Sequence, residues 1–442
     1  MKKIGLGLVA LISIASIYYF TFGASQLTEE IKLQVNTQLA SLEKEGFEIK
    51  ERKIEEKKEH FIISFDDPKK ISAFLYRQGM QLTAEDAEVL KGLKLGVDTY
   101  YLPDAYSLVS FDIYPIALPE IFTSPSDNDE KHVLEQIEKM LTKKTFLMHV
   151  AINKTASGFK GHIEDFNETI KDQETVNLHL KTLSFKGGIK ENTIHNFTQT
   201  LENFSVFISD EMKVSFSDVK SDYEITGKTL YDYTTHYTID NILVDIKSEL
   251  KIAIQDIDVL STSIVKNNLA SGTIKTLVTH TNITDGKEPY DLENFIVEMK
   301  ASNIDITAIN KMQKADLSDK KVMNDILKQL FSKEVKFEIS TLSLESIEND
   351  GQKIDGFELG AKVALHKDFD VLALERNPLS ALRTIDGDVK LEFSKELYEL
   401  IAQQPQAMMA LMMFPPKDEN DKKQYTFELQ NGKFTVNGKP IM

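Results

Sequence analysis

Residues 231–254 read YDYTTHYTIDNILVDIKSELKIAI. Apolar side chains occupy every second position in much of this segment, and the parity of the pattern changes between Ile239 and Ile242. A period of two is typical of strands that bury one face. A similar slip precedes Leu183, and a slip of this kind indicates a bulge or a turn. The segment therefore predicts long, half-buried β-strands.

The same alternation fills nearly all of residues 147–306. Parallel strands need helical crossovers of a dozen or so residues, and none separates the strands here, so we expect a large antiparallel sheet. A four-residue phrase of the form apolar, acidic, polar, apolar recurs in this region, which favours a meander of similar hairpins. It occurs at residues 163–166, 201–204, 239–242 and 292–295.

The C-terminal residues give the strongest local signal in the chain. Two alternating runs, YTFELQ (425–430) and KFTV (433–436), flank Asn431 and Gly432. An Asn-Gly pair between two such runs predicts a type I′ hairpin, because both turn residues must adopt positive φ.

Helical spacing of apolar residues predicts five helices of modest length. They lie at residues 27–42, 83–93, 129–141, 317–331 and 394–413. The first is a stalk or partner helix, or it packs its stripe on the body of the protein, and we favour packing. That stripe consists of Leu27, Ile31, Val35, Leu39 and Leu42.

The N-terminus has the pattern of a membrane anchor. Lys2 and Lys3 precede an uncharged run at residues 4–22, which as a helix is roughly 28 Å long. The positive-inside rule leaves the lysines in the cytoplasm, so we expect a single-pass inner-membrane protein whose bulk is periplasmic. Two alternatives stay open: a signal peptide cleaved near residues 23–25, and a buried helix of a cytosolic protein.

These patterns together predict an α+β fold. A large twisted antiparallel sheet with a few helices follows a single N-terminal transmembrane helix. The predicted segments are a signal-anchor at 1–25, an N-terminal α+β region at 26–142, a β-rich antiparallel region at 143–310, and a C-terminal α+β region at 311–442 that ends in the hairpin.

Composition and motifs argue against several classes of function. The charge balance of 52 basic and 69 acidic residues gives 52 − 69 = −17, which disfavours binding of nucleic acid. The absence of cysteine excludes disulfides, thiolate metal sites and cysteine nucleophiles. The nine histidines show no ligand spacing, and nucleophile, phosphate-loop and dinucleotide motifs are missing. We therefore expect no enzyme activity, no cofactor and no metal site.

Two groups of residues are candidates for apolar contact. The first is a methionine-rich run, for which three interpretations stay open: Cu(I) binding through thioethers, adaptable contact with a lipid or partner, and ordinary core packing. Its members are Met408, Met409, Met412 and Met413. The second group, Ile242, Val244 and Ile246, would line a trough if the sheet held acyl chains. Residues 165–169, DFNET, also fit an extended bacterial glycosylation sequon at Asn167.

Both ends of the chain resemble the YdgA-like bacterial family of unknown function. The residues that carry the resemblance are the ending YTFELQNGKFTVNGKP (425–440), the basic head with its amphipathic segment (2–42), and the phrase at 292–309 with TLSL at 341–344. The charged residues 53–60 stand where the family has an aromatic and Arg-Gly phrase, and a His-Gly-Pro-Phe-like stretch is also missing. The resemblance implies an inner-membrane-anchored periplasmic protein and carries over no catalytic residue.

The sequence thus favours a non-enzymatic, inner-membrane-anchored periplasmic protein with a structural or interaction role in the envelope. Its partners would be the membrane, through the anchor, and an envelope protein. The alternative is a carrier of lipid in an apolar groove of the sheet, which predicts a continuous apolar trough.

Overall fold

The computed structural model describes most of the chain. The described residues are 28–77, 88–123, 128–171, 174–190, 193–209, 211–247, 249–286, 288–312, 320–349, 351–367, 369, 382–404, 411 and 413–441. The predicted anchor, residues 83–87 of the predicted helix at 83–93, and Met408, Met409 and Met412 lie outside them. Within the described ranges, no helix is both long and apolar enough to span a bilayer.

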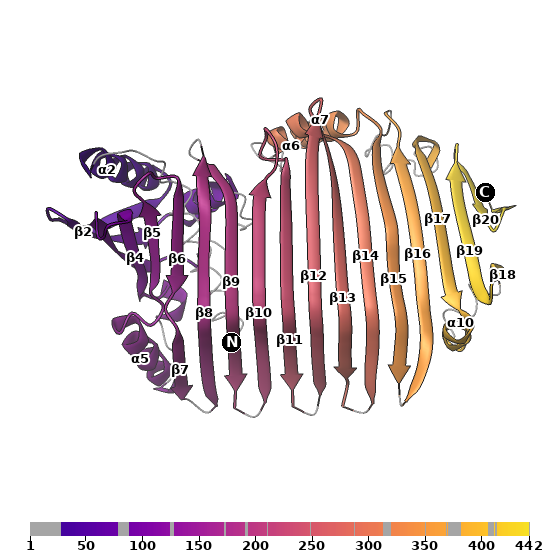
Figure 1. Cartoon of the computed structure of the whole chain (residues 1–442), viewed down its shortest axis with the longest axis horizontal. Helices are drawn as coiled ribbons and strands as arrows, with labels where there is room; N and C mark the ends of the chain where they lie inside the picture. The colour runs from indigo at the N-terminus through magenta and orange to yellow at the C-terminus, as the bar shows by residue number, and fades with distance from the viewer. Residues whose placement is uncertain are drawn as a thin grey trace. The chain divides into compact units, whose positions relative to one another are not determined.

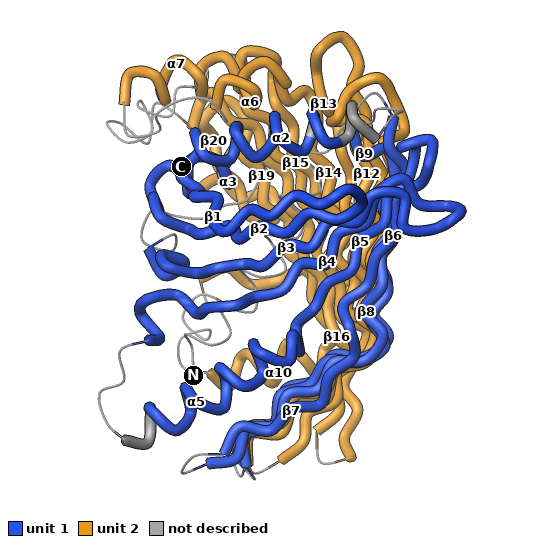
Figure 2. Tube along the Cα trace, turned by 90° about the vertical axis from the view of Figure 1, so that its left-hand side faces the viewer, with its two compact units in different colours: residues 1–222 blue, residues 223–442 orange. Residues whose placement is uncertain are grey.

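The chain forms two compact units, Met1–Asp222 (unit 1) and Tyr223–Met442 (unit 2) (Figure 2). The division into four segments that the sequence predicts stays a prediction. Each unit is built on an antiparallel sheet, and every described strand pair is antiparallel, which confirms the predicted class of sheet.

The strands of unit 1 follow one another through the sheet, and β6 and β7 share one edge of the long strand β8. In chain order the strands are β1 (Phe47–Ile54), β2 (Lys58–Phe65), β3 (Lys94–Tyr101), β4 (Ser107–Ala117), β5 (Met148–Asn153), β6 (Gly158–Ile163), β7 (Phe166–Lys171), β8 (Thr175–Lys190), β9 (Thr193–Ile208) and β10 (Met212–Ile225), whose last three residues belong to unit 2.

Helices α2 (Thr28–Lys44) and α3 (Pro68–Arg77) pack against the first strands of unit 1, near which Figure 2 labels them. Val35, Leu39 and Leu42 of α2 are 0 to 3% exposed and belong to a core cluster with the alternating residues Phe61 and Phe65 of β2. The amphipathic stripe therefore packs on the body, as favoured from the sequence. A second cluster forms where α5 (Asn128–Thr142) meets β7 and β8.

Unit 2 is an extended meander of long strands (Figure 1). The strands are β11 (Tyr233–Ile246), β12 (Leu250–Lys266), β13 (Leu269–Thr284), β14 (Pro289–Asp305), β15 (Val335–Asn349), β16 (Gln352–Leu365), β17 (Ile385–Ser394), β18 (Lys417–Glu419), β19 (Lys422–Gln430), β20 (Lys433–Val436) and β21 (Lys439–Pro440). In Figure 1, α6 (Ile306–Met312) and α7 (Lys320–Leu330) lie at one end of these strands, and α10 (Lys395–Ala402) lies near the other.

At the parity slips seen in the sequence the paired strands keep their register, but one residue in a strand of the pair adopts positive φ. Before Leu183, Thr182 adopts φ +50° and its backbone N–H donates to Asp165 Oδ1 at 2.6 Å. In unit 2, Asp256 of β12 and Asn294 of β14 adopt φ +51° and +50°, a conformation that Asp and Asn tolerate better than most residues. The recurring four-residue phrase lies at these breaks, so it marks the places where two polar residues interrupt the alternation.

Several local predictions are confirmed. Strands β5 to β14 occupy 148–305, and the predicted helices at 129–141 and 317–331 correspond to α5 and α7. Asn431 and Gly432 have φ of +52° and +75°, as a type I′ turn requires.

Three local features differ from the sequence prediction. The single helix predicted at 394–413 is wrong, since α10 ends at Ala402. A proline follows at position 405, and the residue before a proline is forced out of helical geometry. The short helices α3 and α6 were missed altogether.

Candidate functional site

The two faces of the sheet in unit 2 differ sharply in chemistry. Cross-strand register aligns one residue from each of β11 to β17 in a straight row, and every residue in that row is apolar. The row contains Ile239, Ile257, Val278, Phe295, Leu344, Phe357 and Phe393. Because directly paired residues point to the same side of a sheet, these seven side chains share one face.

Rows on both sides extend this surface, which we call the apolar face. A second row lies two residues further along each strand. It contains Tyr237, Val259, Thr276, Val297, Leu342, Leu359, Leu391 and Tyr425. A third row lies beyond the parity slips and contains Ile242, Ile254, Thr281, Leu292, Ile347 and Ile354. At each slip two residues, instead of one, separate neighbours on the same side of the sheet, so residues three positions apart, such as Ile239 and Ile242, share a face.

The opposite face of the sheet carries charged pairs. His236 Nε2 lies 2.9 Å from Asp258 Oδ2, and Lys353 Nζ lies 2.6 Å from Glu293 Oε2. The hydrogen bonds that Lys353 and Ser346 donate to Glu293 hold its pKa below the ordinary value. This face has the composition of a solvated surface, which leaves the apolar face as the unusual one.

Within unit 2, the described helices lie near the ends of the strands and not over the middle of the apolar face (Figure 1). Both clusters of buried apolar residues found in the described ranges belong to unit 1. Several buried apolar side chains of unit 2 lie on its helices, among them Ile326 on α7 and Leu397 on α10. In between, most residues of the rows are partly exposed, although Leu344 is 8% exposed; Tyr237 and Phe337 are 43% and 44% exposed.

Helix α10 lies at one end of the apolar face, where Lys423, the cross-strand partner of Phe393, places its Nζ 5.6 Å from the centroid of the Tyr398 ring. Leu397 of α10 and Tyr425 of β19 are buried, and the Tyr425 ring stacks on Phe427 with centroids 6.0 Å apart. Burial, together with the neighbouring Tyr398 hydroxyl, raises the pKa of Tyr425 far above its usual range. The tyrosine therefore stays neutral, and this end of the face carries no charge from it.

The dimensions suit elongated apolar groups. The central row crosses seven strands at a spacing of about 4.8 Å, so it is about 29 Å long. Acyl chains of one leaflet span about half of a hydrocarbon core of about 30 Å. The surface offers neither a nucleophile nor an acid–base pair, so its chemistry is that of apolar contact.

Of the residues that the sequence marks for apolar contact, Ile242, Val244 and Ile246 lie half-buried on β11 in this face. Met413 is 71% exposed, and the other three methionines lie outside the described residues. The contributions of β12 to β17 could not be found from the sequence, because only the register shows which residues align.

The register also brings together two histidines that the sequence does not show to be neighbours. His149 and His162 are 13 positions apart and pair directly across β5 and β6. The part of the chain that the structure describes contains no group of three or more side chains suited to hold a metal ion.

A family model described as "Bacterial protein of unknown function (DUF945)" matches residues 156–442, which include the whole of unit 2. No curated protein and no solved structure matches the chain.

Proposed function

The chain belongs to DUF945, a family of bacterial proteins of unknown function, and we propose that it binds lipid acyl chains on the apolar face of unit 2. The observation that carries the proposal is the unbroken row of seven apolar side chains on seven adjacent strands, with no described helix of unit 2 over its middle. Monomeric proteins rarely leave a contiguous apolar patch of more than a few hundred Å² exposed unless it binds something.

The chemistry of the face favours an acyl chain over a protein surface. Protein interfaces carry about one hydrogen bond per 100–200 Å², and their rims are polar. The central row contains no side chain with a hydrogen-bonding group, and the rows beside it add only the separate hydroxyls of Tyr237, Thr276, Thr281 and Tyr425. A largely apolar occupant therefore suits this surface.

Apolar contact supplies the driving force for binding. Each methylene fully removed from water contributes about 0.8 kcal/mol, so ten methylenes buried against the rows contribute at most about 8 kcal/mol, from which an association cost of at least about 4 kcal/mol is subtracted. Binding also covers the half-exposed rings of Tyr237 and Phe337. Lipid would therefore stabilise the sheet of unit 2.

We propose that this activity is exercised at the inner membrane. The uncharged run at 4–22 behind two lysines supports a single-pass anchor, and the YdgA-like resemblance supports a periplasmic location for the acidic bulk. No catalytic group enters the proposal, so the protein acts without enzymatic chemistry. A reporter fused after residue 442 tests the topology: periplasmic activity agrees with it, and activity only in the cytoplasm contradicts it.

A second candidate is an envelope protein that docks a protein partner on the same face. The observation in its favour is the exposure of Tyr237, Tyr290, Met299 and Phe337, because aromatic residues and methionine are enriched at protein interfaces. In this role the protein would be a structural or interaction component of the envelope.

Native mass spectrometry of the full-length protein, purified in mild detergent, separates the two candidates. Lipid binding predicts adducts with the masses of phospholipids or fatty acids, which organic extraction recovers. Protein without lipid, but with a stoichiometric co-purifying polypeptide, would support the docking role and contradict the lipid proposal.

A further inference from the structure

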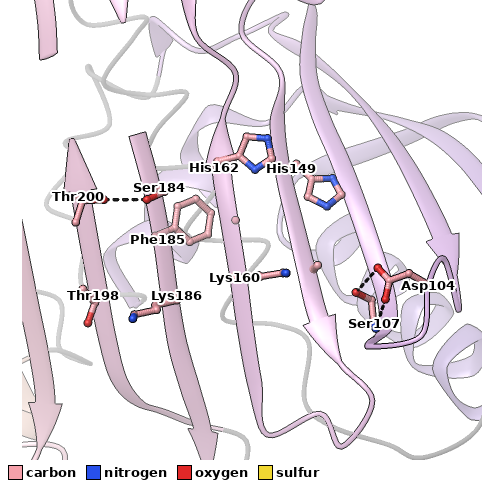
Figure 3. A pocket seen from close by; sticks show the side chains of 12 residues that line it. Asp104, Ser107, His149, Lys160, His162, Ser184, Phe185, Lys186, Thr198 and Thr200 are labelled. Carbon is pink, nitrogen blue, oxygen red and sulfur yellow. Dashed lines mark hydrogen bonds between the residues drawn. The ribbon is translucent and has the colours of Figure 1, made fainter. Parts of the chain in front are cut away.

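Unit 1 has a shallow depression of about 600 Å³ on the side of its sheet that carries His149 and His162 (Figure 3). Its floor is formed by side chains of β5, β6, β8 and β9, and its rim by the loop before β4. The lining includes Lys160, Lys186, Ser184, Thr198 and Thr200, besides the two histidines.

Two lysines lie directly opposite each other in this depression. Lys160 of β6 pairs with Lys186 of β8, and like charges at directly opposed positions destabilise a sheet. Neither lysine forms an ion pair with a described residue, although the chain as a whole carries a net charge of −17. A bound anion would convert this repulsion into attraction.

Neighbouring side chains add hydrogen-bonding capacity next to the lysines. Ser184 and Thr200 share a hydrogen bond of 2.8 Å between their hydroxyls, which uses one of the two O–H donors and leaves the other for a ligand. His149 faces His162 with ring centroids 5.5 Å apart. His149 is oriented by a 2.7 Å contact of Nδ1 with Asp112, which leaves its Nε2 unused.

The only carboxylate in the lining is Asp104, and its oxygens are already occupied. Oδ1 accepts the backbone N–H groups of Ser107 and Tyr106, both at 2.7 Å, and Oδ2 accepts the Ser107 hydroxyl at 2.9 Å. These hydrogen bonds, that of Ser107 first, hold the pKa of Asp104 below its ordinary value. The charge of Lys160 also contributes to this lowering, so Asp104 compensates Lys160 in part, whereas the lining holds no second carboxylate for Lys186.

We propose that this depression binds a phosphate-class dianion, either free phosphate or a phosphomonoester, between Lys160 and Lys186. Two ammonium groups match the two negative charges, and lysine binds phosphate as a point charge without demanding bidentate geometry. The hydroxyls of Ser184 and Thr200 lie one row away on the same face, and the one whose O–H is not used between them donates to a remaining oxygen.

Isothermal titration of the full-length protein tests this site with two probes, sodium phosphate and glycerol 3-phosphate, at a pH of about 8, where both are largely dianionic. The wild type is expected to show saturable binding of at least one probe. Binding of phosphate alone identifies the free ion as the ligand, and binding of the ester identifies a phosphomonoester; both results support the site. No saturable heat with either probe would overturn it.

The variant Lys160→Gln/Lys186→Gln is expected to bind the anion at least about tenfold more weakly, because both charges are removed. Both lysines are exposed, so the fold should persist, and each single variant should show part of the loss. The matched control is Lys131→Gln/Lys139→Gln on the exposed side of α5, which changes net charge equally. An equal loss in the control would show a general charge effect and contradict the site.

Discussion

Replacing Val259 with Glu should abolish most acyl-chain binding with little effect on folding. Val259 lies on β12 in the apolar face, between Tyr237 and Thr276 of its row. A carboxylate at this position is hydrated in the free protein and loses water when a chain covers it. The effective penalty for burying an ion is several kcal/mol, and a penalty of about 3 kcal/mol corresponds to about 100-fold weaker binding.

The adjacent residue supplies the control. Leu260 is 40% exposed on the opposite face, where it pairs with His236 and Lys275. Leu260→Glu adds the same charge to the same strand beside two basic groups, so lipid binding should stay within about twofold of the wild type.

Titration with cis-parinaric acid, whose fluorescence rises in apolar surroundings, gives the dissociation constants of both variants. Urea denaturation gives their free energies of unfolding, which should agree within about 1 kcal/mol because Val259 is only half-buried. Equal affinities of the two variants would refute the assignment of the binding face. A loss of more than about 3 kcal/mol in Val259→Glu alone would show that the face is a covered core.

Three further predictions concern the scaffold. Glu59→Ala should lower the free energy of unfolding, measured in urea, by about 3 kcal/mol. Glu59 is 1% exposed and its Oε1 lies 2.5 Å from Arg52 Nε, so the substitution removes the ion-pair partner of Arg52. A loss below about 1 kcal/mol would contradict this. Burial disfavours the charged form of Asp98, but hydrogen bonds, led by that from Lys144, outweigh it and place its pKa below the ordinary value. Ionised Asp98 therefore stabilises the folded state at any pH above its pKa in the unfolded chain, and this stabilisation is lost as the pH falls through its lower pKa in the folded protein. Acid titration from about pH 5 to about pH 2 should reduce the free energy of unfolding more in the wild type than in Asp98→Asn. Gly432→Ala should cost about 1 kcal/mol in thermal unfolding, because residue 432 has φ +75°; an unchanged melting temperature would argue against the turn.

The local part of the fold could be predicted from the sequence because its signals are local. Alternation with a period of two identifies a strand. The slip between Ile239 and Ile242 identifies a break in the alternation, and Asp256, which lies opposite it on the paired strand, adopts positive φ. The Asn431-Gly432 turn is equally local, since positive φ at both positions leaves few alternatives to a type I′ hairpin. The apolar stripe of α2 likewise identified the side that packs on the core.

Features that depend on register could not be predicted. Ile239 and Phe393 belong to one row, but five strands and, among the described residues, the helices α6 and α7 lie between them along the chain. The same holds for Lys160 and Lys186, which become neighbours only after β7 and β8 have formed their hairpin. Each residue alone has an ordinary environment, and only their alignment creates the apolar face and the basic depression.

The end of α10 shows a different limit. Apolar and methionine residues continue the helical pattern to 413, but the chain leaves the helix at Gln403, two residues before a proline. Backbone geometry therefore outweighed side-chain periodicity, and Met413 is exposed rather than buried on that helix.

A single introduced tryptophan tests the central claim most directly, because the natural chain contains none. Val297 faces the apolar side of β14, and its neighbour Ile296 faces the charged side. Phospholipid with brominated acyl chains should quench the fluorescence of Val297→Trp strongly and leave Ile296→Trp nearly unchanged. Equal quenching of the two variants, or none in either, would contradict acyl-chain binding on the apolar face.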